Sequence, residues 1–202
     1  DVAPLDDLIA VADRHDAILL IDEAHATGVF GPAGRGLAAD LEGRGNVVTL
    51  RTCGKALGAE GALVLGPRIV RDFLINRGRG FIFSTAPSPL MAEAVRESLK
   101  ILQDEPERRA MLHARIALAG ELLTPLGAQC NGTQILPLII GQDEQAMAMA
   151  DRLQQEGFDI RGIRPPTVPQ GTARLRISIT RNVTKGDIGA LCESLDRIMI
   201  PA

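Results

Sequence analysis

Aromatic side chains are scarce in this sequence of 202 residues, which has no Trp, no Tyr and five Phe. Few rings are therefore available to stack on a flat ligand. The net charge of −3 provides no electrostatic attraction to nucleic acid or to an anionic membrane surface. No apolar run approaches the length that spans a bilayer, and no segment has the pattern of a signal peptide. We therefore expect a cytoplasmic protein that binds neither nucleic acid nor membrane.

Cysteine is equally sparse. Cys53, Cys130 and Cys192 lie far apart in the sequence, without the spacing that is typical of metal ligands. An odd and scattered set indicates reduced thiols in the cytosol rather than a disulfide framework. We therefore expect no metal site built on these cysteines.

The remaining composition is that of an ordinary globular protein, with 46% hydrophobic and 23% charged residues. The length allows one large domain, or one domain and part of another. The sequence begins without Met, inside an expected helix, so we expect it to be part of a longer polypeptide.

The first part of the sequence alternates helix with apolar strand. A helix is expected over residues 4–15, where apolar residues share one face, acids occupy the first turn and bases occupy the last. Residues 17–21 are apolar throughout, which is typical of a parallel strand buried on both faces. Residues 47–50 and 62–65 are two further short apolar runs. This alternation predicts an α/β fold with a mostly parallel sheet.

A smaller α+β domain with an antiparallel sheet is expected to follow. A helix over 67–76 and a short strand, Phe81–Phe83, precede two prolines that indicate a hinge. The predicted organisation is a large-domain portion over 1–88, connecting helices over 89–126 and a small domain over 127–202. The elements expected in the small domain are strands at 135–140 and 173–179, a helix at 144–156, and a last helix capped by Thr184 and Asp187.

Two polar segments follow the predicted strands. Asp22 ends the first strand and His25 comes three residues later, while Lys55 lies between Gly54 and Gly58 in the turn after the second. Ligands of open α/β sheets gather beyond the carboxyl ends of the strands. A lysine there can form an imine with an aldehyde cofactor, and a carboxylate can pair with a protonated pyridine nitrogen. The alternatives are a solvated surface lysine and a loop acid or helix cap.

Four further residues carry weaker signals. Thr52, Ser84 and Thr85 can offer hydroxyl groups to a phosphate, although such residues more often bond to the local backbone. Arg176 lies in a strand that alternates apolar and polar residues, and its planar fork suits an amino-acid carboxylate. A solvated arginine on a sheet face explains the same pattern equally well.

Taken together, the motifs resemble the α-oxoamine synthases, which are fold-type I enzymes that use pyridoxal 5'-phosphate (PLP). The segments that carry the resemblance are Asp-Glu-Ala-His-Ala-Thr-Gly (22–28), Gly-x-x-Gly-Arg-Gly (31–36), Thr-Cys-Gly-Lys-Ala-Leu-Gly (52–58), Phe-Ser-Thr-Ala-Pro-Ser-Pro (83–89) and Ala-Arg-Leu-Arg-Ile-Ser-Ile (173–179). Residues 163–169, Ile-Arg-Pro-Pro-Thr-Val-Pro, are most similar to the branch that makes 8-amino-7-oxononanoate. The resemblance runs over essentially the whole sequence in the right order.

The resemblance implies a role for each candidate residue. Lys55 would be the Schiff-base lysine and the base that removes the α-proton of alanine. Asp22 would pair with the pyridine nitrogen, and His25 would contact the ring oxygen. Thr52 would bind the phosphate, with Thr85 contributing across a homodimer interface, and the sixth residue, Arg176, would hold the substrate carboxylate.

The implied reaction joins L-alanine to pimeloyl-CoA, or to pimeloyl-acyl-carrier protein, and yields 8-amino-7-oxononanoate, CoA and CO2 in biotin biosynthesis. Sister branches that use glycine or serine, and a non-catalytic partner module, are the alternatives. Members of the family carry roughly another half-chain before this point, which holds a phosphate loop and the His that stacks on the ring. We therefore expect these 202 residues to be inactive alone.

Overall fold

The computed structural model describes residues 2–199, which form two compact units that divide between Arg109 and Ala110. The division falls inside helix α5 (Pro106–Leu123). The sequence-based boundaries at residues 88 and 126 stay a prediction. No helix in the described part of the chain is long and apolar enough to cross a membrane.

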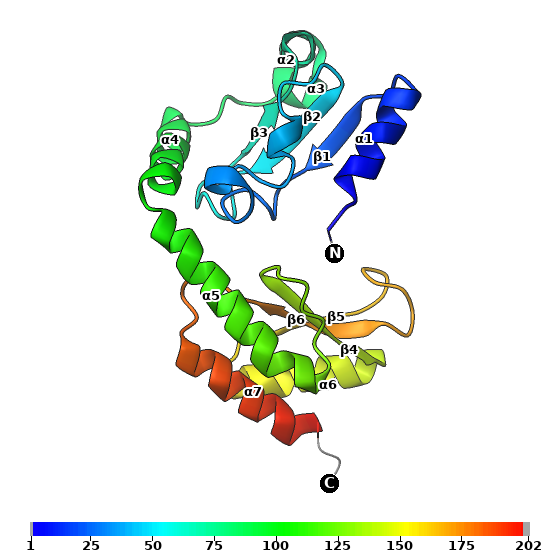
Figure 1. The fold of residues 1–202 in the computed structure, drawn as a ribbon, viewed down its shortest axis with the longest axis vertical. Helices are drawn as coiled ribbons and strands as arrows, with labels where there is room; N and C mark the ends of the chain where they lie inside the picture. Colours follow the sequence, from blue (N-terminus) through cyan, green and yellow to red (C-terminus); the bar gives the residue numbers. More distant parts are fainter. Residues whose placement is uncertain (1, 200–202) are drawn as a thin grey trace. The chain divides into compact units, whose positions relative to one another are not determined.

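The first unit contains a three-stranded sheet in the order β1-β2-β3 (Figure 1). Strand β1 (Leu19–Asp22) runs parallel to β2 (Val47–Thr52), whereas β3 (Ala62–Leu65) is antiparallel to β2. The expected α/β class is confirmed, but the sheet is mixed. The reason is the connection: only residues 53–61 join β2 to β3, and a parallel crossover needs a longer segment.

One face of this sheet is covered by helix α1 (Leu5–Arg14), whose Ile9 and Ala12 pack with Ile21 and Val47. The opposite face of β1 is open to solvent, as shown by Leu20, which is 68% exposed. The expectation that this strand is buried on both faces is therefore wrong for residues 2–199. Strand alternation places Leu20 and Asp22 together on the open face.

Four helices and two short 3₁₀ turns follow in the first unit, the last helix leads into the second unit, and a third 3₁₀ turn lies in the second unit. The helices are α2 (Arg68–Arg77), α3 (Arg79–Ile82), α4 (Pro89–Asp104) and α5, and the turns are η1 (Pro32–Gly34), η2 (Ala39–Leu41) and, in the second unit, η3 (Thr124–Leu126).

The strand predicted at Phe81–Phe83 is wrong, because the chain forms helix α3 there. The carbonyl of Gly78 accepts hydrogen bonds from the N–H groups of Phe81 and Ile82, so the backbone groups are satisfied locally. A run of three apolar residues is too short for periodicity to distinguish helix from strand.

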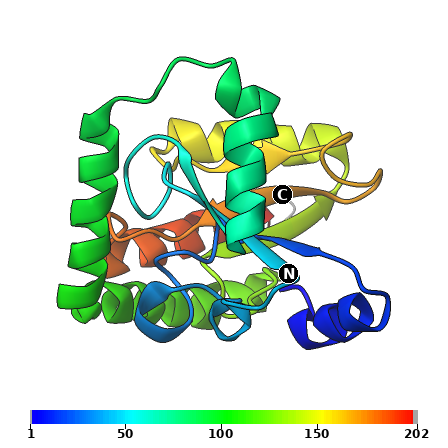
Figure 2. The ribbon, with the colours of Figure 1, turned by 90° about the horizontal axis from the view of Figure 1, so that it is seen from above.

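The second unit is an antiparallel sheet in the order β4-β6-β5 with helices packed on one face (Figure 1, Figure 2). The expected antiparallel α+β arrangement is confirmed. The sequence reading missed β5, which is three residues long and has a glycine at its centre. The elements are β4 (Ile135–Gly141), α6 (Asp143–Gln155), β5 (Arg161–Ile163), β6 (Ala173–Ser178) and α7 (Lys185–Met199).

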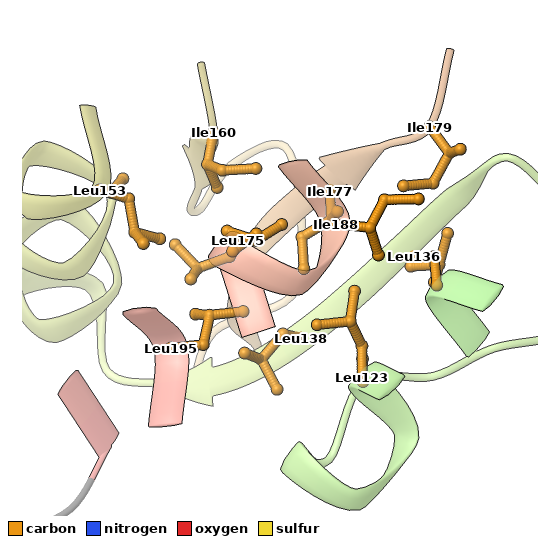
Figure 3. Packing of buried hydrophobic residues seen from close by; sticks show 14 of the residues in the cluster. Leu123, Leu136, Leu138, Leu153, Ile160, Leu175, Ile177, Ile179, Ile188 and Leu195 are labelled. Atoms are coloured by element: carbon orange, nitrogen blue, oxygen red, sulfur yellow. The ribbon is translucent and has the colours of Figure 1, made fainter. Parts of the chain in front are cut away.

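The core of this unit lies between the sheet and its helices (Figure 3). Leucine and isoleucine side chains from both partners interdigitate there, and the largest fully buried ones are Leu123, Leu136, Leu138, Leu153, Leu175, Ile177, Ile188 and Leu195. The alternation predicted for residues 173–179 is confirmed, because Leu175 and Ile177 enter this core while Arg174 and Arg176 lie on the other face.

Helix α7 begins at the capping box predicted from the sequence. Thr184 donates its N–H and its hydroxyl to Oδ2 of Asp187, at 2.7 and 2.8 Å, and the N–H of Asp187 donates to the Thr184 hydroxyl oxygen. These bonds favour the carboxylate, so they hold the pKa of Asp187 below its usual value. The reciprocal bonds satisfy backbone donors that the first turn of a helix leaves unpaired.

Candidate active site at the ends of β1 and β2

Asp22 and Thr52 end two neighbouring parallel strands. The register pairs Asp22 with Leu50, and Thr52 lies two residues beyond Leu50 on the same strand. Because side chains alternate along a strand, Asp22, Leu50 and Thr52 share the open face of the sheet. The structure thus brings together two of the predicted site residues at one sheet edge.

Asp22 is an exposed carboxylate in a local turn. Its Oδ1 accepts a hydrogen bond from the N–H of Ala24 at 2.8 Å, which is the loop-acid arrangement considered as an alternative. That bond occupies one of the two carboxylate oxygens. His25, also exposed, follows in a tight turn in which the N–H groups of Ala26 and Thr27 bond to the carbonyl of Glu23.

Lys55 lies in a rigid turn beyond β2. The N–H of Gly58 bonds to the Lys55 carbonyl at 3.0 Å, and the N–H of Ala59 bonds to the Cys53 carbonyl at 2.9 Å. The hydroxyl of Ser98 on α4 donates to the Leu57 carbonyl at 2.7 Å and ties the turn to that helix. The ammonium group of Lys55 is exposed and has no hydrogen bond or ion pair within residues 2–199.

Cys53, two residues before the lysine, is not a competing nucleophile. Its side chain is 1% exposed, and burial raises the pKa of the thiol. A buried neutral thiol is chemically inert, because the thiolate is the reactive form. Reactivity in this turn therefore belongs to the Lys55 amine.

The two loops that follow β1 and β2 are packed against each other. Gly28 has a φ of +79°, and a Cβ placed on it would lie 2.6 Å from Cβ of Ala56, the neighbour of Lys55. This contact means that Gly28 fixes the approach of the loop that carries Asp22 and His25 to the turn that carries Lys55. It is the close approach that only a glycine permits.

A charged cluster behind the strand ends was missed by the sequence analysis. Glu23 and Arg51 are 2% and 5% exposed, and Nη1 of Arg51 lies 3.5 Å from Oε2 of Glu23. Arg51 also donates through Nη2 to Oε1 of Glu42 at 2.5 Å. The only sequence signal was an arginine at the end of an otherwise apolar strand, directly before Thr52.

The hydroxyl candidates differ in their surroundings. Thr52 is half-buried, and its hydroxyl has no hydrogen-bond partner in the described part of the chain. Ser84 donates to the carbonyl of Phe81 at 3.2 Å, in the local turn bonding considered as its alternative. Thr85 is exposed between α3 and α4 and has no partner in residues 2–199. The structure does not bring Thr85 to the β1 and β2 loops.

Arg176 belongs to the second unit and is distinguished there from Arg174. Nε of Arg174 donates to the Thr172 carbonyl at 2.9 Å. The half-buried guanidinium of Arg176 makes no hydrogen bond or ion pair with any described residue. Its antiparallel neighbours are Pro137 and Arg161, so Arg161 and Arg176 share the face opposite the core. Of the two β6 arginines, Arg176 is the one available to an anion.

The donor set at the ends of β1 and β2 fits an aldehyde cofactor that carries a phosphate and a basic ring nitrogen. An exposed carboxylate and an unbonded hydroxyl end the two strands, at Asp22 and Thr52, and an unpaired amine follows in the turn beyond β2, at Lys55. No group of three or more His, Cys, Asp or Glu side chains within residues 2–199 is placed to hold a metal ion.

Comparison with known proteins shows the family to which this chain belongs. Residues 1–195 match the aminotransferase class I and II family. The chain belongs to this family. Curated relatives include the 8-amino-7-oxononanoate synthases of Ralstonia pickettii, 42% identical over 97% of this chain and 49% of the relative, and of Delftia acidovorans, 40% identical over 98% of this chain and 52% of the relative. The chain therefore spans about half the length of the curated relatives it matches.

Solved structures of the family share the fold. The chain superposes on a serine palmitoyltransferase of Sphingomonas wittichii with a TM-score of 0.89 at 25% identity, covering 98% of this chain and 51% of that one. It superposes on 8-amino-7-oxononanoate synthase of Francisella tularensis with a TM-score of 0.79 at 26% identity, covering 94% and 57%. A further palmitoyltransferase structure, at 28% identity and a TM-score of 0.89, contains PLP; it covers 98% of this chain and 51% of that one. These matches confirm the expected fold-type I class.

The contact between the two loops can be tested by placing a methyl group at Gly28. Gly28→Ala combines a positive φ with a 2.6 Å clash against Ala56, whereas Gly43→Ala has a similar φ of +86° and no atom within 4 Å. The left-handed conformation alone costs about 1–2 kcal/mol. We expect Gly43→Ala to lower the free energy of unfolding by about this amount and Gly28→Ala by more, in denaturant titrations. Equal losses would show that the loops can separate freely.

Proposed function

We propose that the protein containing this chain is a PLP-dependent acyltransferase. It condenses L-alanine with a pimeloyl thioester, of CoA or of acyl-carrier protein, and releases 8-amino-7-oxononanoate, CO2 and the free thiol, in biotin biosynthesis. The observation that carries the proposal is the placement of Asp22, Thr52 and the unpaired Lys55 beyond two parallel strands, in a chain 40% identical to an enzyme of that name. The protein acts as a cytoplasmic homodimer with its active site at the interface, and residues 1–202 alone are inactive.

PLP, when bound, supplies an aldehyde that captures an amino group and a protonated ring that withdraws electrons from the neighbouring carbon. Three residues at the strand ends hold it. The amine of Lys55 would bond to it covalently, the Asp22 carboxylate would keep a proton on the ring nitrogen, and the Thr52 hydroxyl would donate to the phosphate. His25 would contact the ring oxygen, and Thr85 would reach the phosphate site from the partner subunit.

Lys55 also performs the proton transfer. Its amine is exposed and makes no ion pair in the described chain, so it can exchange a proton with a substrate. Once the amino group of alanine has displaced it from the aldehyde, Nζ of Lys55 would remove the α-proton, and the backbone bonds of the turn 53–59 fix the main chain from which this side chain extends. A base attached to a fixed main chain within the site avoids the entropy cost of a separate encounter with the substrate.

Arg176 binds the substrate carboxylate. Its guanidinium lacks a partner in the described residues, and the planar fork can donate two parallel hydrogen bonds to a carboxylate. Because Arg174 already donates to the Thr172 carbonyl, the two arginines are not equivalent.

A sister reaction with glycine or serine is the second candidate. The serine palmitoyltransferase structures, with TM-scores of 0.88 and 0.89, support it as a related chemistry on the same fold. The curated relatives at 40–45% identity favour the alanine reaction. A non-catalytic partner module is the least favoured alternative, because such a module need not keep both Asp22 and Lys55.

Covalent attachment tests the role of Lys55. The full-length protein treated with PLP and borohydride should carry a reduced cofactor on the peptide that contains Lys55, detected by mass spectrometry, and Lys55→Ala should carry none. Lys100→Ala is the matched control, since Lys100 forms an ion pair with Glu97 on α4 and should leave labelling unchanged. A label on Lys100 or Lys185 in the wild type would refute the assignment.

Exchange of the substrate α-proton in deuterated water tests the amino acid. With the PLP-loaded full-length protein, we expect exchange to be fastest with alanine and slower with glycine and serine, followed by NMR. Faster exchange with glycine or serine would overturn the 8-amino-7-oxononanoate assignment in favour of a sister reaction.

The same assay tests Arg176. Arg176→Lys keeps the charge but loses the second hydrogen bond of the fork, so the alanine concentration for half-maximal exchange should rise about tenfold. Arg174→Lys serves as the control and should change it little. If the two variants behaved alike, the carboxylate would be bound elsewhere.

A further inference from the structure

The charged cluster behind the strand ends is built around the buried pair Glu23 and Arg51. Each lies next to a residue of the proposed cofactor site, because Glu23 follows Asp22 and Arg51 precedes Thr52. The N–H of Glu23 still bonds to the Leu50 carbonyl at 2.8 Å, so the strand pairing extends to this residue. By alternation, Glu23 and Arg51 face the covered side of the sheet while Asp22 and Thr52 face the open side.

Arg51, on β2, contacts separate parts of the loop that joins β1 to β2. Its Nη1 donates to the Thr27 hydroxyl oxygen at 3.3 Å and to the Arg35 carbonyl, and its Nη2 donates to Glu42 at 2.5 Å. The side chain of Arg35 also pairs with Glu42. Two acids and two arginines therefore close a charge-balanced cluster between the strand end and the loop.

Glu23 fixes the other end of the same loop. Its Oε1 accepts a hydrogen bond from the N–H of Ala38 at 2.9 Å. Its Oε2 has no hydrogen-bond partner in the described chain and relies on the charge of Arg51 at 3.5 Å. A Cβ on Gly36 would lie 1.4 Å from this oxygen, so Gly36 leaves the space that the carboxylate fills.

Stability alone does not account for such a pair. The desolvation of two charges commonly offsets their attraction, and an apolar pair of the same volume often stabilises a protein as well or better. The loop between them contains Gly28, Gly31, Gly34 and Gly36, all with positive φ, so its backbone has many alternative conformations when unrestrained. Fixed, directional contacts select one of them.

We propose that Glu23 and Arg51 are positioning residues of the cofactor site. They hold residues 24–38 against the end of β2 and thereby set His25, and the Ala24 N–H that orients the Asp22 carboxylate, relative to Thr52 and Lys55, without touching the cofactor themselves. This inference rests on the proposed function, since it concerns the geometry of the same PLP site.

The test compares single and double variants of the full-length protein. Glu23→Gln keeps the shape and the acceptor for Ala38 but removes the charge, and Arg51→Met removes the guanidinium. Glu23→Gln leaves Arg51 with Glu42 as its remaining ion-pair partner, and Arg51→Met leaves the buried Glu23 carboxylate without a cation, whereas the double variant leaves neither buried charge in place. Arg44→Met is the matched control, because it breaks an exposed ion pair with Asp13 in the same unit.

Three quantities are measured: the thermal unfolding midpoint, the dissociation constant of PLP from its visible absorbance, and hydrogen exchange of residues 24–38 without PLP. We expect both single variants to unfold at lower temperature and the double variant to recover much of that loss. We expect all three to bind PLP about tenfold or more weakly, as misplaced site residues do, and to exchange faster in residues 24–38. Arg44→Met should bind PLP as the wild type does.

The outcomes separate positioning from a purely structural role. If PLP binding recovered in the double variant together with the unfolding midpoint, or if no variant changed PLP binding, the positioning role would be refuted while the proposed function stood. If the wild-type protein failed to bind PLP through Lys55, the proposed function would fall and this inference with it.

Discussion

The register of β1 against β2 is the constraint on which the site depends. It pairs Asp22 with Leu50, and so decides that Asp22 and Thr52 face the open side of the sheet. A slip of β1 by one residue would turn Asp22 to the covered side while Thr52 stayed on the open side, because the side-chain period of a strand is two. The register is held by Ile21 and Val47 in the core and, at the start of β1, by the bond from the Leu19 N–H to the Asn46 carbonyl.

The candidate site residues and the residues that support them lie on opposite sides of the sheet at the strand ends. The open side presents an exposed carboxylate and a free hydroxyl, and the turn beyond β2 presents an unpaired amine; these groups suit binding but contribute little to stability. The covered side contains Glu23 and Arg51, whose contacts reach the loop through Thr27, Arg35 and Ala38. A glycine-rich loop can approach a ligand closely only if something else limits its conformations, and here charge pairing does so.

The sequence supplied candidate residues for the site but not the side chains that support them. Asp22 and Lys55 stand in short motifs whose spacing indicates an aldehyde-cofactor site, and the long periodic elements were placed correctly. The buried pair was missed because the burial of Glu23 depends on residues 35–42, which local patterning does not reveal. Arg176 could be separated from Arg174 only once the bond from Arg174 to Thr172 was seen. The prediction of a strand at 81–83 was wrong because a run of three apolar residues is too short to show whether the hydrophobic period is that of a helix or of a strand.

The central claim is that Asp22 serves the ring nitrogen of a cofactor bound to Lys55. The most direct measurement is nitrogen NMR of PLP labelled at its ring nitrogen, bound to the full-length protein and to its Asp22→Asn variant at neutral pH. A carboxylate beside the nitrogen stabilises the proton there, so we expect a protonated ring in the wild type and an unprotonated ring in the variant. The same protonation state in both proteins would contradict the account.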